Sequence, residues 1–355
     1  YKTTADVERA LTLPAGSTVT LYAISEPGIS ITYNGNGADT TTNIDNVEQY
    51  TTNLDSTSTV DLLASNFTRD GYGFVGWSTD SDAWDKFVAG ENPTIYGPNQ
   101  TITVDPTAST KLTLYAIWAD LATDKNGEEL TFQTENLLTT QLSDNENDTL
   151  ANKDNGYVTA LKDERDGEVY AVAKLADGNY WMIENLRLDD SATLTKTEGV
   201  TKGNTNNPSL PLTNVYGSTT SNRLSASSNN WCYNNNAGCI NQSKINTDNT
   251  TNTVSTMNST DANVYSYGNY YNWYSATAGN GTYNTTSGNV VGDLCPAGWQ
   301  LPIGNETSEN GSFSHLDVAM GSSGSWSNSS AQLRSFPNNF VYSGGYYGQY
   351  NKPQQ

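Results

Sequence analysis

The sequence predicts a mainly β protein that contains some α-helical structure. Apolar and polar residues alternate along 17–24 and 110–117, as they do in half-buried strands. A hairpin pattern covers 169–183, where an Asp-Gly-Asn turn separates two apolar segments. The composition agrees, because 30 Gly, 22 Tyr and 8 Trp supply turns and large aromatic side chains. We therefore expect small aromatic cores inside a polar exterior.

The acidic charge balance excludes two classes of partner. Asp and Glu number 38 against 17 Lys and Arg, which gives a net charge of -21. Nucleic acids and anionic lipids are bound through clustered basic residues, so we expect no nucleic-acid partner and no adhesion to anionic lipid. No apolar run approaches the length of a membrane span, and we expect no direct membrane insertion in this segment. We expect the signal and the anchor to lie outside this chain.

An internal repeat organises the N-terminal part of the chain. The residues Ser-Thr-Val-Thr-Leu-Tyr-Ala-Ile at 17–24 recur as Thr-Lys-Leu-Thr-Leu-Tyr-Ala-Ile at 110–117. We expect residues 1–27 to be the C-terminal part of one β repeat and 28–119 to be a complete repeat. Tandem repeats of this size are typical of a rod or stalk.

Three motifs follow one another inside the complete repeat. An expected strand leads into Asn-Gly-Asn-Gly at 34–37, and Thr-Arg-Asp-Gly-Tyr-Gly-Phe-Val-Gly-Trp at 68–77 and Thr-Leu-Tyr-Ala-Ile-Trp at 113–118 come later. This set resembles the Listeria–Bacteroides repeat, or internalin B-repeat, whose hallmarks are an Asn-Gly-Gly-like turn, a TRDGYTFDGW stretch and a closing TLYAKW. The resemblance implies a β-grasp-like module of a bacterial surface protein, here with a longer middle at 38–60.

Residues 120–156 are polar, and we expect a linker or an irregular lead-in to the next domain. Within this stretch Asp144, Glu146 and Asp148 place carboxylates at alternate positions, a pattern that suits calcium. The Gly at position six and the Glu at position twelve of an EF-hand loop are missing. A solvated linker without metal is therefore the alternative, and we expect no other cofactor.

Three further motifs mark the C-terminal part from residue 157 onward. They are Arg-Asp-Gly through Trp-Met-Ile-Glu-Asn-Leu at 165–186, Tyr-Asn-Trp-Tyr-Ser-Ala at 271–276 and Cys-Pro-Ala-Gly-Trp-Gln-Leu-Pro at 295–302. In this order they resemble the Fibrobacter succinogenes major paralogous (FISUMP) domain. The resemblance implies an α+β, C-type-lectin-like domain over 157–355, with a long insertion at 190–264. The family domain continues to a further strand with a cysteine, so we expect this domain to be incomplete at its C-terminus and Cys295 to pair outside this chain.

The insertion supplies candidate binding residues, because long loops without a core of their own are usually binding surfaces or disordered. The candidate ligand-binding residues are aromatic side chains among polar, loop-forming residues: Trp231, Tyr233, Tyr265 and Tyr267. The spacing of Cys232 and Cys239 predicts a disulfide that closes a short loop in an exported protein.

The sequence contains no recognisable catalytic constellation, and we expect no enzyme. Its single histidine, His315, cannot form a triad or a His-rich metal site alone. No feature fixes two carboxylates across a cleft, as glycoside hydrolysis requires. We expect Trp181, Trp273 and Trp299 to be core residues rather than sugar-binding platforms.

Together these features predict an extracellular protein of the bacterial cell surface that acts in adhesion or recognition. The repeats would form a stalk and the lectin-like domain a binding head for a protein or glycan on a host or bacterial surface. Two alternatives stay open. One is a structural subunit of a surface fibre or layer that binds copies of itself, and the other is a hypervariable ligand-display protein.

Overall fold

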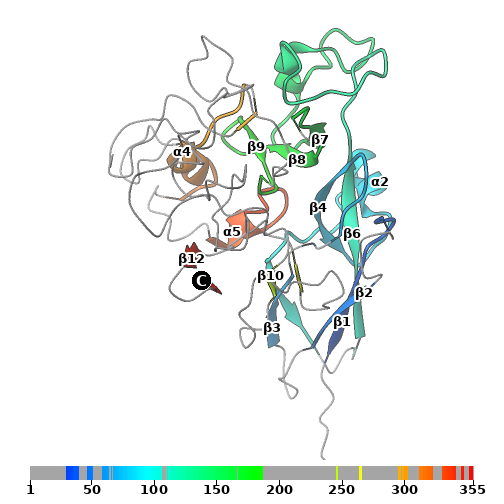
Figure 1. The fold of residues 1–355 in the computed structure, drawn as a ribbon, viewed down its shortest axis with the longest axis vertical. Helices are drawn as coiled ribbons and strands as arrows, with labels where there is room; N and C mark the ends of the chain where they lie inside the picture. Colours follow the sequence, from blue (N-terminus) through cyan, green and yellow to red (C-terminus); the bar gives the residue numbers. More distant parts are fainter. Residues whose placement is uncertain are drawn as a thin grey trace, which may run out of the picture.

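The protein is mainly β with a few short helices, as the strand patterns predicted (Figure 1). The structure is a computed structural model. It describes residues 29–39, 46–50, 58–63, 65, 67–105, 109, 111–165, 167–186, 245–246, 264–265, 295–296, 298–302, 312–322, 330–340, 345–347 and 352–354. We call residues 29–120 the N-terminal unit, 121–156 the lead-in, and the described residues of 157–340 the C-terminal unit.

A mixed sheet forms the N-terminal unit. Its strands are β1 (Ser30–Asn34), β2 (Asn46–Tyr50), β4 (Tyr72–Ser78) and β6 (Lys111–Asp120), in the order β2-β1-β6-β4. The central strands β1 and β6 are parallel, and the two outer pairs are antiparallel. A ribbon of β3 (Ser58–Asp61) and β5 (Thr101–Val104) packs on one face, and helix α2 (Ala83–Val88) follows β4.

The core between this sheet and the ribbon is aromatic. Ile31 and Tyr33 are buried while their neighbours along β1 are half-buried, which is the alternation expected of a strand. Trp77 lies at the centre, with ring centroids 4.8 Å from Tyr33 and 5.0 Å from Phe74, both edge to face. Its indole nitrogen donates to the Leu63 carbonyl at 2.8 Å, so the ring is buried without an unsatisfied donor. Each fully buried side chain of this size contributes about 1.5–3 kcal/mol.

The lead-in differs from a polar linker, although it is as irregular as expected. It contains two short 3-10 turns, η1 (Leu137–Thr139) and η2 (Leu150–Asn152). Several of its apolar residues, including Leu130 and Phe132, are buried against the next sheet, whereas Leu138 is exposed. The amides of Ala122 and Phe132 donate to β7 carbonyls, each at 2.9 Å. A few irregularly spaced apolar residues hold the segment in place. The polar composition of the segment as a whole therefore did not predict this packing.

The C-terminal unit is built on an antiparallel meander. Its strands are β7 (Val158–Lys162), β8 (Val169–Lys174) and β9 (Tyr180–Met182). The predicted hairpin at 169–183 is confirmed, and Gly178 has a φ of 78° in its turn. The remaining elements are short: β10 (Ile245–Asn246), β11 (Val264–Tyr265), α4 (Ser312–Ala319), α5 (Ser330–Arg334), β12 (Gly345–Tyr347) and β13 (Lys352–Gln354). Within the part of the chain that the structure describes, no helix is both long enough and apolar enough for a membrane span.

The two units share one hydrophobic core. Val75 and Ile117 of the N-terminal sheet are in the same buried cluster as Val158 and Ala171 of the meander, and Leu333 of α5 joins them. Figure 1 shows β7 and β8 beside the upper ends of β4 and β6. The polypeptide also continues from β6 into a parallel bridge between Leu121 and Ala160. The contact between the units is therefore a packed interface, which we call the seam.

Candidate functional site

A group of polar contacts lies where β4, the edge strand of its sheet, meets the C-terminal unit. An open sheet edge exposes backbone donors and acceptors that can pair with another chain. Along β4, Trp77 exchanges two backbone hydrogen bonds with Tyr96, at 2.8 and 2.7 Å. The Phe74 amide donates to Oε2 of Glu184 at 3.2 Å, and the Val75 carbonyl accepts from Nδ2 of Asn339 at 2.7 Å. Side chains of the C-terminal unit thus cover this edge.

Glu184 links the two sheets through one atom. The same Oε2 atom accepts from the Ala171 amide at 2.6 Å. The chain brings the carboxylate there because the amide of Ile183, the preceding residue, donates to the Ala171 carbonyl at 3.0 Å. Hydrogen bonds from amides to a carboxylate are stronger than neutral ones, so this oxygen is well suited to join β4 to β8.

Two glycines permit the close approach at the seam. A Cβ built on Gly73 would lie 2.5 Å from the Ala171 nitrogen, and one built on Gly97 would lie 2.0 Å from the Arg334 carbonyl oxygen. No other residue fits such positions without movement of the backbone. The Arg334 guanidinium also donates to the Asn99 carbonyl at 3.2 Å. The N-terminal unit therefore meets β8 and the end of α5 through backbone contacts.

Aromatic residues continue the seam on the side of α2. Trp84 stacks on Phe87 with ring centroids 5.6 Å apart, and Phe87 meets Phe336 edge to face at 5.3 Å. The Trp84 indole donates to the Asp120 carboxylate at 2.7 Å. These rings are half-buried, whereas Val88 at the end of the helix is 66% exposed.

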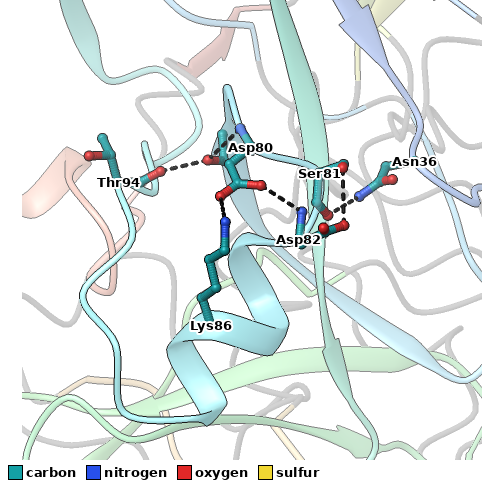
Figure 2. A network of polar contacts seen from close by, with 7 residues as sticks. Asn36, Asp80, Ser81, Asp82, Lys86 and Thr94 are labelled. Atoms are coloured by element: carbon teal, nitrogen blue, oxygen red, sulfur yellow. Dashed lines mark hydrogen bonds and ion pairs between the residues drawn. The ribbon is translucent and has the colours of Figure 1, made fainter.

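A polar network fixes the loop that precedes α2 (Figure 2). The Asp80 carboxylate pairs with Lys86 and accepts from the Asp82 amide at 3.0 Å. The hydrogen bond with Lys86 lowers the pKa of the Asp80 carboxyl and raises that of the Lys86 ammonium. Asn36 donates to the carbonyls of Ser81 and Ala116, each at 3.0 Å. The network ties the loop to the sheet, and its exposed, mutually paired groups have a structural role.

A buried ion pair organises the β7–β8 turn. The side chains of Asp163 and Arg165 are 0% and 5% exposed, and Arg165 Nε lies 2.8 Å from Oδ1 of Asp163. The same oxygen accepts from Gln133 of the lead-in at 2.8 Å. Thr131 donates to Glu164 at 2.8 Å nearby. The carboxylate is engaged by these partners and holds the lead-in against the turn.

The three carboxylates predicted to suit calcium lie in the lead-in. Asp144 and Glu146 are exposed, and Asp148 pairs with Lys153 at 2.6 Å. The hydrogen bond from Lys153 lowers the pKa of the Asp148 carboxyl. Among the described residues, no three His, Cys, Asp or Glu side chains are placed to hold a metal ion. Calcium binding stays a prediction, and melting curves with calcium and with a chelator test it.

Most of the candidate ligand-binding residues lie outside the described residues. This holds for Trp231, Tyr233 and Tyr267 and for both cysteines of the expected disulfide, Cys232 and Cys239. For Tyr265 the structure describes the strand β11 and nothing of the side chain. The ligand and disulfide predictions therefore stay predictions.

Two of the motif tryptophans, which were expected to be core residues, are half-buried and pack against the margins of the cores. Trp181 is tilted against Phe313, with ring centroids 5.1 Å apart, and Trp299 meets Phe132 edge to face at 5.0 Å. The third, Trp273, lies outside the described residues. His315 is exposed on α4.

The residues that close the edge of β4 were not singled out from the sequence. Glu184 lies within the Trp-Met-Ile-Glu-Asn-Leu motif. Its position as a charged residue directly after an apolar strand is the feature of the sequence that could have identified it. Asn339 is far from β4 in the sequence and gave no signal.

Comparisons of the chain with protein-family models, with curated proteins and with solved structures find no match. The fold and the seam define the chain as a mainly β protein in which two structural units share a core.

Proposed function

We propose that this protein acts in adhesion or recognition on the bacterial cell surface. In this proposal the N-terminal unit is a β-grasp-like repeat that supports a C-type-lectin-like binding head. The strand order with parallel β1 and β6 at the centre supports the first assignment, and the motifs at 165–186, 271–276 and 295–302 support the second.

The shared core is the observation that favours this function. A head that binds a surface under load must pass force to its support, and a packed interface does so better than a flexible linker. Val75 and Ala171 are each 0% exposed at the seam, so both side chains are fully enclosed at the centre of the contact. In this proposal the polar loops of the head bind the ligand.

Binding by the purified chain to arrays of glycans and of host surface proteins tests the proposal. We expect at least one ligand class to bind, and we expect the combined variant Trp231→Ala and Tyr233→Ala to reduce that binding at least about tenfold, as loss of aromatic contact residues does. Val88→Ser is the matched control, because it removes an exposed apolar side chain from the N-terminal unit. The absence of binding by the folded chain on both arrays would contradict the proposal.

A further inference from the structure

We infer that the β4 face of the N-terminal unit is a docking surface for the C-terminal unit of the same chain, and that this repeat is a permanent part of the head. A stalk repeat joined by a hinge would keep its own solvated surface. The inference does not depend on what the head binds.

The first argument is the closure of the β4 edge. The Phe74 amide and the Val75 carbonyl bond to Glu184 and Asn339, and both partners come from the C-terminal unit. Asn339 is 1% exposed, and its φ of 54° holds the backbone in a conformation that few residues adopt readily. Without the C-terminal unit these two backbone groups would need new partners.

The second argument is the chemistry of the β4 face. Gly73 leaves room for the backbone of Ala171, and Val75 is 0% exposed in the shared core. A strand face in contact with water usually carries polar side chains, whereas a glycine and a buried valine suit contact with a second sheet. Both residues lie where the C-terminal unit packs.

The third argument concerns the meander itself. A three-stranded sheet is stable only when a hydrophobic face packs against another element. The residues of β7 and β8 that enter the shared core are small and apolar: Val158, Ala160, Val169, Ala171 and Ala173. Ala160, Ala171 and Ala173 are 0% exposed, and they allow the N-terminal sheet to approach closely. The meander therefore depends on the N-terminal unit for its burial.

The test places a side chain and a charge in the seam of the full chain with Gly73→Thr and Val75→Asp together. Amide hydrogen exchange is followed by mass spectrometry on peptides from β7 and β8 and from β1. We expect exchange at β7 and β8 to accelerate at least about tenfold while β1 keeps its protection, because the seam opens and the aromatic core remains. Thr113→Asp is the matched control, since it adds a charge to the same sheet at an exposed position, and we expect no change at β7 and β8.

Unchanged protection at β7 and β8 in the paired variant would overturn the inference, as would two separate unfolding transitions in the wild-type chain. A second experiment covers a variant that does not fold. A protease site is placed in the exposed turn at 124–128 of the otherwise wild-type chain, which is cut after folding. We expect the two pieces to elute together in size-exclusion chromatography, and elution as two separate species would overturn the inference.

Discussion

Gly73 and Ala171 lie so close that a Cβ on Gly73 would meet the Ala171 nitrogen at 2.5 Å and its Cα at 2.8 Å. The neighbour that would have to move is backbone of a central strand, since β8 pairs with both β7 and β9. The spacing between the two sheets is therefore set by the absence of one side chain.

A Gly73→Ala substitution should destabilise the protein by about 1–3 kcal/mol, the usual cost of overpacking. In a strand without such a contact, the same change would stabilise by about 0.5–1 kcal/mol, because glycine loses more backbone freedom on folding. The sign of the change in unfolding free energy, measured by urea denaturation, separates the two cases. A stabilised variant would show that the sheets are not in close contact here.

Replacing Glu184 by Ala should lower the free energy of unfolding by about 2–3 kcal/mol, because a buried amide donor is left unsatisfied when its charged acceptor is removed. Glu184→Gln keeps an acceptor oxygen and should cost less. Guanidinium denaturation measures both variants. Glu129→Gln is the control: Glu129 pairs with Lys162 at an exposed site, and we expect a change within about 0.5 kcal/mol. Equal changes in the free energy of unfolding on substitution of Glu184 and of Glu129 would contradict a bridging role for Glu184.

Asp163→Asn should lower the free energy of unfolding by about 1–3 kcal/mol, because it removes the buried carboxylate that accepts from Arg165 and Gln133. Adding Arg165→Met to this variant should restore part of the loss, since the guanidinium that faced this carboxylate is then gone. Thermal melting measures the stability of the single and the double variant. A double variant as unstable as the single one would show that the ion pair itself is not the cause.

The stability of the lead-in should depend on pH through Asp148. Lys153 holds the pKa of this carboxyl below its usual value of 3.8. A carboxyl with a lowered pKa stabilises the folded state above its unfolded pKa, and this contribution disappears as the pH falls through the folded value. Below pH 4 the urea midpoint of the wild type should therefore fall more steeply than that of Asp148→Asn. Parallel curves for the two proteins would rule out this contribution.

Local patterns predicted the elements of the fold that depend on nearby residues. The alternation in 110–117 predicted a strand there, and this strand is part of β6. The Asp-Gly-Asn turn predicted the 169–183 hairpin, which is formed by β8 and β9. An aromatic core was also expected, and the motif at 68–77 supplies Phe74 and Trp77 to it, whereas Tyr33 comes from β1. For the strand and the hairpin, the signal and the structure it produces are close in the sequence.

The seam was not predicted, because its determinants are distributed along the chain. Gly73 stands between Tyr72 and Phe74 in the motif at 68–77, and nothing near it in the sequence indicates that Ala171 lies against it. The lead-in was expected to be a linker or an irregular segment because it is polar as a whole, yet apolar residues such as Phe132 and Leu150 pack it on the meander. Polar composition averages over a segment, whereas burial depends on a few side chains.

The hydrogen bond from Asn339 to the Val75 carbonyl joins residues 264 positions apart. During synthesis from the N-terminus, strand β4 is made long before the side chain that completes its edge. An N-terminal unit that folds early would present an incomplete edge to other chains until Asn339 has also been made. Pairing over such a separation is slow because the loop must close first. During that interval the open edge of β4 can pair with the strand edges of other nascent copies.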